Sequence, residues 1–246
     1  MSQPHWLEPR LGPLFPNTRQ ALSEPNGLLA VGGELSTPWL LEAYRRGIFP
    51  WFSEGEPILW WSPTPRMVLL PGTAHRSRTL RKQFRASQIQ ISVNRCFDSV
   101  IHHCAQNDLR SGGTWITEPM MQAYLGLHHD GWAHSVEVLD SGRLIGGLYG
   151  VAIGTVFFGE SMFSLSPSAS KYAFVALSEW TRRQGMELID CQLYNPYLDS
   201  LGAQLIDRPT FEKYLPRALS RLSLLDPIVL QKLFEQKMRA PHDDRY

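Results

Sequence analysis

Residues 133–163 constrain the fold more than any other stretch of the chain. Three strands are predicted there in direct succession, over residues 133–140, 143–153 and 155–163. The sequence Asp140-Ser141-Gly142 is a hairpin turn signal between the first two. Three strands joined so closely must lie side by side in one sheet, so the rest of the chain has to be arranged around that sheet.

A helix and a further strand are predicted next. Ser166 is placed to cap the helix and Pro167 to occupy its first position, both common at helix starts. The helix is predicted to run to Gln184 and to end at Gly185, and residues 186–193 form the next strand.

Upstream, the pattern indicates one strand and two helices, over residues 89–93, 95–106 and 117–129. The whole order is therefore β-α-α-β-β-β-α-β, which is the element order of a GNAT-type acyltransferase. The predicted fold class is α+β with a mixed sheet.

The segment from Gly47 to Arg66 has an unusual composition, with three tryptophans, two phenylalanines and four prolines. Prolines are avoided in a central strand and tryptophans in a solvated loop, so we interpret it as a stiff aromatic wall. It follows a predicted helix over residues 35–49. We expect residues 1–66 to form a small N-terminal domain and residues 67–246 a GNAT-like catalytic domain.

The bulk composition excludes several classes of protein. The formal net charge of the 246-residue chain is +1, so any contact with nucleic acid must depend on a local patch. There is no apolar run near the roughly 18 residues needed to cross a bilayer, and no apolar core of a signal peptide at the start. Three widely spaced cysteines argue against a disulfide scaffold, and the histidines show no metal-ligand spacing. We expect a cytoplasmic protein with no membrane contact and no metal.

The turn between residues 161 and 174 argues against acetyl-CoA as the acyl carrier. GNAT enzymes hold pyrophosphate there on a glycine-rich turn, whereas this stretch has no glycine. A different carrier is indicated by basic residues at helical spacing, which suit a phosphate backbone or, alternatively, form a solvated face. The candidates for binding such a nucleic-acid backbone are Arg76, Arg78, Arg81, Lys82 and Arg85.

Polar residues inside two apolar strands are the candidate catalytic groups. Glu160 needs a cation or a hydrogen-bond donor, which a structural ion pair or a bound ammonium group could supply. Asp190 and Gln192 fall on one face of their strand and Cys191 on the other. A cysteine acyl-enzyme is the rival mechanism, and a buried structural thiol is the interpretation that this alternation favours.

Several long blocks resemble leucyl/phenylalanyl-tRNA–protein transferase over about Glu24 to Ala203. They are PNGLLAVGGELS, LLEAYRRGIFPWF, ILWWSPTPR, GTWIT, AYLGLHHDGWAHSVEV, GGLYGV, FFGESMFS, SASK, LIDCQ and NPYLDSLGA. That family moves Leu or Phe, and Met less well, from aminoacyl-tRNA onto proteins that begin with Arg or Lys. The product carries an N-degron read by the bacterial degradation machinery, and no cofactor is implied.

The resemblance also assigns roles to residues. Gln192 would orient the attacking amine, Asp190 would polarise the Gln192 amide, and Glu160 would hold the α-ammonium group of the donor. Trp51 and Trp115 would receive the terminal adenosine of the tRNA. The apolar pocket for the donor side chain would comprise Phe157, Met162 and Ile189, with Leu148 and Leu177 as neighbours.

Four positions depart from the family pattern. Glu34 and Thr64 replace aspartates, Ser168 replaces an asparagine and Tyr197 a common histidine. Trp60 and Trp61 are expected to hold the two domains together, and we expect a monomer. The alternatives are a CoA-dependent N-acyltransferase and a noncatalytic tRNA-binding module.

Overall fold

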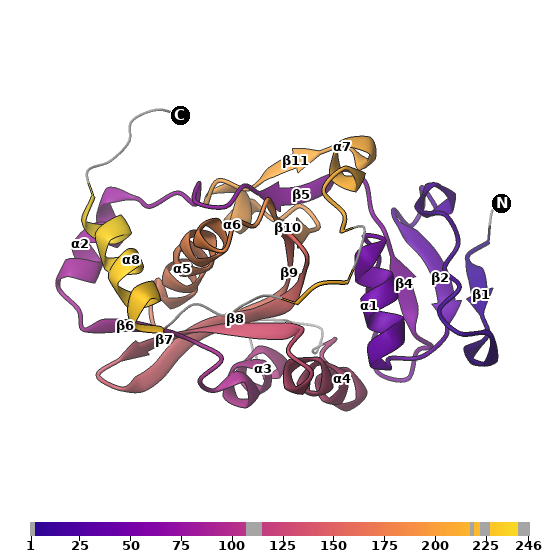
Figure 1. The fold of residues 1–246 in the computed structure, drawn as a ribbon, viewed down its shortest axis with the longest axis horizontal. Coiled ribbons are helices and arrows are strands. Elements are labelled where there is room, and N and C mark those ends of the chain that lie inside the picture. The colour runs from indigo at the N-terminus through magenta and orange to yellow at the C-terminus, as the bar shows by residue number, and fades with distance from the viewer. Residues whose placement is uncertain (1–2, 107–114, 217–218, 222–226, 241–246) are drawn as a thin grey trace.

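A small N-terminal sheet and a larger mixed sheet make up the framework of the protein (Figure 1). The structure is a computed structural model that describes residues 3–106, 115–216, 219–221 and 227–240. The first two residues of the GTWIT block, Gly113 and Thr114, lie outside the described residues. The small sheet has the order β1-β2-β4-β3, with β1 at His5–Leu7, β2 at Leu28–Gly32, β3 at Phe49–Pro50 and β4 at Leu59–Trp61.

The larger sheet has the order β11-β5-β10-β9-β8-β7-β6. Its strands are β5 (Arg66–Leu69), β6 (Ile89–Val93), β7 (Ala133–Asp140), β8 (Arg143–Ile153), β9 (Val156–Ser164), β10 (Leu188–Gln192) and β11 (Gln204–Ile206). Neighbours pair antiparallel except β9 and β10, which are parallel because a helix carries the chain across between them.

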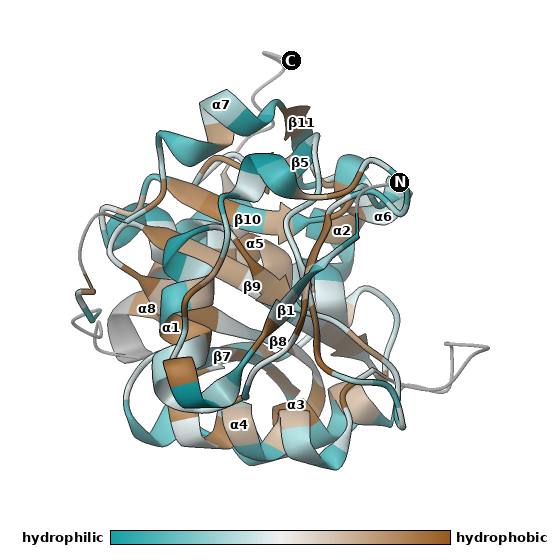
Figure 2. Ribbon diagram, turned by 90° about the vertical axis from the view of Figure 1, so that its right-hand side faces the viewer, coloured by the Kyte–Doolittle hydropathy of each residue, from teal (hydrophilic) through white to brown (hydrophobic). Residues whose placement is uncertain are grey.

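Helices cover both faces of this sheet (Figure 1). On one face lie α2 (Arg78–Arg85), α5 (Ala169–Arg183) and α8 (Pro227–Arg239), and on the other lie α3 (Phe97–Ala105) and α4 (Glu118–His129). Helix α1 (Thr37–Arg45) stands between the two sheets, and the short α6 (Pro196–Asp199) and α7 (Arg208–Glu212) follow β10. Figure 2 shows the strands β9 and β10 in brown, inside a shell of helices that carry both brown and teal residues.

The predicted α+β class, the mixed sheet and the order β-α-α-β-β-β-α-β are confirmed, with β6, α3, α4, β7, β8, β9, α5 and β10 in those places. The predicted start of α5 is wrong by two residues. Ser168 adopts a left-handed conformation with φ 69°, which a right-handed helix cannot include, so α5 begins at Ala169.

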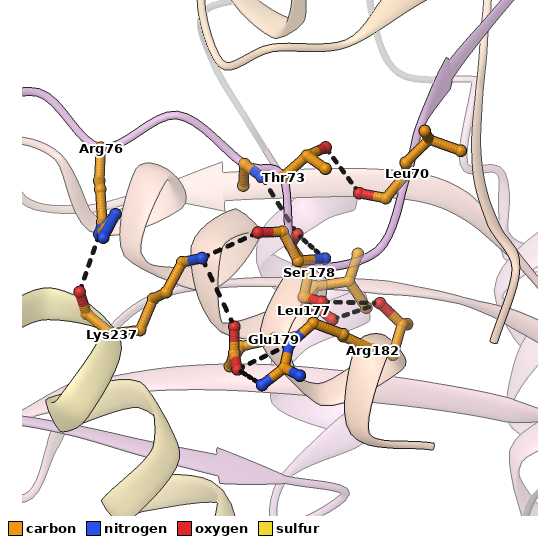
Figure 3. Close-up of polar contacts among 11 residues, drawn as sticks. Leu70, Thr73, Arg76, Leu177, Ser178, Glu179, Arg182 and Lys237 are labelled. Atoms are coloured by element: carbon orange, nitrogen blue, oxygen red, sulfur yellow. Dashed lines mark hydrogen bonds and ion pairs between the residues drawn. The ribbon is translucent and has the colours of Figure 1, made fainter. Parts of the chain in front are cut away.

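Helix α8 is tied to α5 by a polar network (Figure 3). The buried carboxylate of Glu179 pairs with Arg182 on its own helix and lies 3.8 Å from the ammonium group of Lys237 on α8. Lys237 also donates a hydrogen bond of 2.8 Å to the carbonyl of Gly72, and Arg76 donates to the carbonyl of Lys237. This network fixes the segment that leads into α2.

The expected role of Trp60 in holding two domains together stays a prediction, because its ring and hydrogen-bond contacts lie within the N-terminal part. Trp60 is fully buried within the N-terminal part, where its ring packs against Phe15 and Trp39, and its Nε1 donates to the carbonyl of Gly32. One hydrophobic cluster nevertheless runs from this part into the α3–α4 face of the larger sheet. None of the helices within the described residues is long and apolar enough to cross a membrane.

Candidate active site

A cavity of about 1420 Å³ opens where β9 and β10 diverge. The two strands pair only as far as Phe158 and Asp190, and the residues that follow on each strand line the cavity. Its other walls come from the aromatic segment after β3, from the start of α5 and from α6. A gap between parallel strands exposes side chains of both faces of the sheet to one space, so apolar and polar groups meet there.

Glu160, on the floor of this cavity, belongs to a closed ring of hydrogen-bonding oxygens. The hydroxyl oxygens of Tyr44 and Tyr124 lie 2.5 Å apart, and each lies 2.7 Å from one carboxyl oxygen of Glu160. Three contacts between oxygens need three protons, and each tyrosine supplies one. The third proton must come from Glu160, so the ring is satisfied when this carboxyl is neutral.

The electrostatics of Glu160 agree with that count. Burial raises the pKa of this carboxyl from 4.5 to about 8, although the two tyrosine hydrogen bonds lower it in part. Burial also raises the pKa of Tyr44 and of Tyr124 well above 10, which keeps both hydroxyls protonated. Of the two alternatives predicted for Glu160, the structural ion pair is wrong, because hydroxyl groups and an amide surround it.

Gln192 reaches Glu160 from the neighbouring strand. Its Nε2 donates a hydrogen bond of 3.0 Å to Oε1 of Glu160. The register between β10 and β5 shifts between Asp190 and Gln192, and Gln192 has φ 64°, in the left-handed region. This β-bulge was not predicted, because nothing in the residues 188–192 marks it.

Asp190 lies beside Gln192 but does not reach the cavity. Its carboxylate is fully buried in a bidentate pair with Arg66, with distances of 2.8 and 2.7 Å. Its Oδ1 also accepts a hydrogen bond of 2.9 Å from the main-chain N–H of Gln192. The expected contact with the Gln192 side chain is therefore wrong: Asp190 holds the main chain of Gln192, while the Gln192 amide is bound to Glu160.

Cys191 packs with the hydrophobic cluster on the α5 face, opposite the face that Glu160 occupies, as the alternation predicted. It also lines the cavity, because the gap between the strands opens that face too. Burial raises the pKa of its thiol far above the usual range, so the thiolate needed for an acyl-enzyme is scarce.

The apolar side of the cavity contains most of the residues expected there. The cavity is lined by Leu148, Met162, Leu177 and Ile189, together with Phe174. Phe157 is not among the lining residues: it is fully buried, with its ring against Trp180 behind the wall. The reason is that its ring makes an edge-to-face contact with Trp180 of α5 and is covered there, instead of facing the gap between the strands.

Tryptophans form the outer wall of the cavity. Trp51 is 41% exposed and its ring lies 5.5 Å from that of Trp61, whose Nε1 donates to the carbonyl of Trp51. Trp115 lines the same cavity, from the segment before α4. Trp61 thus supports Trp51 as part of the wall rather than joining two domains.

Family models match the chain over residues 33–64, as "Leucyl/phenylalanyl-tRNA protein transferase N-terminal domain", and over residues 68–216, as "Leucyl/phenylalanyl-tRNA protein transferase". The chain is 53% identical over 216 residues to the leucyl/phenylalanyl-tRNA–protein transferase of Pseudomonas fluorescens Pf0-1, covering 88% of this chain and 95% of that protein. It is 53% identical over 212 residues to that of Azotobacter vinelandii, covering 86% and 94%. The chain belongs to the leucyl/phenylalanyl-tRNA–protein transferase family.

Membership of the leucyl/phenylalanyl-tRNA–protein transferase family confirms the resemblance drawn from the sequence. Solved structures are similar only at a distance. One is an aminoglycoside N-acetyltransferase in complex with CoA, with 14% identity, a TM-score of 0.32 and coverage of 57% of this chain and 95% of that one. Another is the C-terminal domain of a putative lysylphosphatidylglycerol synthetase from Agrobacterium fabrum, with 14% identity, a TM-score of 0.38 and coverage of 67% and 53%.

The basic residues expected to bind tRNA in this transferase family member are only partly exposed. Arg78 and Lys82 on α2 face solvent. Arg81 donates a hydrogen bond of 2.6 Å to the carbonyl of Ala240, and Arg85 one of 3.5 Å to that of Arg239. Carbonyls at the end of a helix lack partners within it, so these two cations also serve the C-terminal end of α8.

Three residues at the centre of the site were missed by sequence reasoning, namely Tyr44, Arg66 and Tyr124. Each lies in one of the blocks that resemble the leucyl/phenylalanyl-tRNA–protein transferase family, and that position is the signal that could have found them. Of the departures from the family pattern, Tyr197 lines the cavity and its hydroxyl lies 2.7 Å from that of Ser170. Ser168 donates a hydrogen bond to Gln83 of α2.

The described residues contain no group of three or more His, Cys, Asp or Glu side chains that could hold a metal ion.

Proposed function

We propose that this protein transfers Leu or Phe, and Met less well, from aminoacyl-tRNA to the α-amino group of proteins that begin with Arg or Lys. The product would be an N-degron for protein degradation. The observation that carries the proposal is an apolar pocket with a protonated carboxyl at its floor, since an apolar amino acid has an aliphatic or aromatic side chain next to an amine. The relatives that match over most of this chain are named leucyl/phenylalanyl-tRNA–protein transferases, which supports the transfer of Leu or Phe from tRNA to a protein.

The donor would bind with its side chain between Leu148, Met162, Leu177 and Ile189. Its α-amine would then lie beside Glu160. A neutral amine can take the proton of this carboxyl, which gives an ammonium–carboxylate pair and prevents the donor nitrogen from attacking an ester. The pKa of Glu160, raised to about 8, is close to that of an α-amino group, so this proton exchange is nearly balanced.

The terminal adenosine would lie against Trp51 and Trp115 at the outer wall. Aromatic faces stack on adenine, with about 1–3 kcal/mol for each stacked base. Arg78 and Lys82 would contact phosphates of the acceptor arm without reading its sequence, because a point charge on a flexible side chain distinguishes no base.

The chemical step would be a single aminolysis. The nitrogen of the acceptor attacks the ester carbonyl carbon, the bond from that carbon to the ribose oxygen breaks, and the nitrogen loses a proton that ends on the ribose oxygen. Because Nε2 of Gln192 donates to Glu160, its Oε1 is the atom free to accept a hydrogen bond from the attacking amine. An amide is too weak a base to keep the proton.

Two routes for that proton are compared, through Asp190 or through a ribose hydroxyl. Arg66 engages both oxygens of Asp190 and keeps this carboxylate out of the cavity, which favours the ribose hydroxyl. The enzyme then contributes chiefly by positioning two substrates. We propose that it does so as a cytoplasmic monomer.

The test is the transfer of labelled Leu from Leu-tRNA to a peptide that begins with Arg, with acetyl-CoA offered in parallel. Transfer from Leu-tRNA alone supports the proposal. Acetylation of the peptide would instead indicate a CoA-dependent acyltransferase, and tRNA binding without transfer a noncatalytic module.

A further inference from the structure

Arg66 is an almost completely enclosed charged side chain near the cavity, yet it is not among the residues that line it. It is 1% exposed, at the first position of β5. Its guanidinium lies between two aromatic rings, 4.8 Å from the ring centre of Phe49 and 4.7 Å from that of Phe211. Its Nε and one terminal nitrogen bind Asp190, and its Nη1 has no hydrogen-bond partner among the described residues.

An enclosed Arg–Asp pair is a costly way to hold a fold together. Two ions lose their hydration, and well-packed apolar residues in their place are often as stabilising or more so. An ion pair in such a place therefore suggests a role other than stability. Here the pair has a specific neighbour, because Oδ1 of Asp190 accepts at once from Nε of Arg66 and from the main-chain N–H of Gln192.

That main chain is strained. Gln192 has φ 64°, a conformation that is unfavourable for a side chain with a Cβ and persists only where surrounding contacts impose it. The bulge between β10 and β5 occurs at the same place. The hydrogen bond from Gln192 N–H to Asp190 spans this bulge, and Arg66 fixes the carboxylate that accepts it.

The consequence reaches the cavity through the side chain of Gln192. With this main-chain conformation, its amide lies 3.0 Å from Glu160. A relaxed strand would carry Cα–Cβ of residue 192 in another direction. The series of contacts therefore runs from two aromatic rings to Arg66, then to Asp190, to the Gln192 main chain and to the Gln192 amide.

We propose that Arg66 is a positioning residue for aminoacyl transfer: it clamps Asp190, which holds the bulged main chain that presents the Gln192 amide to the attacking amine. The inference rests on the proposed transfer activity and gives Asp190 a positioning role rather than a place in a proton relay. Lysine cannot replace Arg66 on this account, because only the guanidinium fork can bind both carboxylate oxygens while it lies over two aromatic rings.

The main test compares Arg66→Lys with wild type in single-turnover transfer at saturating enzyme. A displacement of about 1 Å at a reacting group can lower a rate about 100-fold, so we expect a loss approaching that size, with the Kd for Leu-tRNA changed less than about threefold. Phe211→Leu removes one ring face of the guanidinium without touching the cavity, and should show a smaller loss of the same kind.

A double-mutant cycle separates positioning from a purely structural role. If Arg66 acts through Gln192, then Arg66→Lys should slow the Gln192→Ala protein less than about twofold, since the group to be positioned is already gone. Independent losses that multiply in the double variant would overturn the proposal. The same cycle with Phe211→Leu decides the question where Arg66→Lys is too unstable to purify.

The matched control is Glu179→Gln, which breaks another buried ion pair, in the network shown in Figure 3, at a residue that does not line the cavity. It should lower the melting temperature about as much as Arg66→Lys and leave the single-turnover rate unchanged. An equal loss of rate in Glu179→Gln would mean that the Arg66 effect reports stability alone, and would overturn the proposal.

Hydrogen exchange gives a measurement that does not depend on activity. The main-chain N–H hydrogen of Gln192 should exchange much faster in Arg66→Lys than in wild type, while Glu179→Gln should leave it protected. Unchanged protection in Arg66→Lys would refute the clamp. If wild type transfers no amino acid, the proposed function fails, and the exchange result shows separately whether Arg66 holds this main chain.

Discussion

Replacing Glu160 by glutamine should make the folded protein more stable at alkaline pH and change little at acidic pH. The ring formed by Glu160, Tyr44 and Tyr124 contains three contacts and needs a proton from the carboxyl. A glutamine amide has the shape of the neutral acid, with a donor in place of the O–H and one remaining oxygen to accept. Glu160→Gln is therefore a permanent version of the protonated state.

The size of the effect follows from the pKa of this carboxyl, which burial raises from 4.5 to about 8 in the folded protein. In the unfolded chain Glu160 loses its proton above about pH 4.5, whereas in the folded protein it keeps the proton up to about pH 8. The folded state binds more protons between these two pH values, so the free energy of unfolding is greatest below the unfolded pKa of Glu160. It falls by about 1.4 kcal/mol per pH unit as the pH rises towards the folded pKa. Between about pH 5.5 and pH 8.5 the loss is about 3 kcal/mol.

The assay is urea unfolding of both proteins, followed by tryptophan fluorescence, at about pH 5.5 and pH 8.5. Other groups titrate equally in wild type and variant, so the difference between the two isolates Glu160. Wild type should lose about 3 kcal/mol relative to Glu160→Gln across this range. A difference that stays constant with pH would show that Glu160 is ionised throughout and that the proton count is wrong. Glu187→Gln, at an exposed carboxylate, is the control and should follow wild type.

Three further outcomes are expected. Trp51→Ala should raise the KM for aminoacyl-tRNA and leave kcat nearly unchanged, because stacking worth about 1–3 kcal/mol is present in ground and transition states alike; a fall in kcat alone would contradict this. Cys191→Ala should keep most of the activity, because burial raises the pKa of the thiol and leaves little thiolate; loss of turnover in a folded variant would restore the acyl-enzyme. Arg78→Glu combined with Lys82→Glu should raise the KM for aminoacyl-tRNA and flatten its salt dependence. The control Arg10→Glu, at an exposed residue of the N-terminal part, should do neither. An unchanged salt slope in the double variant would show that α2 is only a solvated face.

The order of elements could be predicted because local signals mark it. The turn at Asp140-Ser141-Gly142 joins β7 and β8 as expected, and Gly185, with φ 71°, ends α5 where the sequence placed its end. The two short strands β5 and β11 could not be predicted, since their residues carry no distinctive period and gain their pairing only from β10 and from each other. Such short strands depend on tertiary contacts rather than on local propensity.

The candidate site was predictable only in part, for a related reason. Glu160 and Gln192 stand out as polar residues in apolar strands, and single strands display that contrast directly. Arg66 and Asp190 are 124 positions apart, and Tyr44 and Glu160 are 116 apart. Pairs so distant are brought together by the fold, and no spacing in the sequence reveals them. The left-handed conformation of Gln192 has the same origin, because it is accompanied by contacts from other strands, with Arg66 bound to Asp190 and Glu160 bound to the Gln192 side chain.

The N-terminal part contributes directly to the site, so the segment around the aromatic wall supplies more than an outer surface of the cavity. Tyr44 of α1 completes the ring around Glu160, and Phe49 of β3 covers one side of the Arg66 guanidinium. Trp51 then forms the outer wall of the same cavity. Within eight residues, from Tyr44 to Trp51, the chain thus reaches the floor, the clamp and the mouth of one site, and the fixed φ of Pro50 stiffens the chain between Phe49 and Trp51. A catalytic sheet without this part would lack a proton donor in the Glu160 ring and a ring face on Arg66, so aminoacyl transfer requires both parts of the chain.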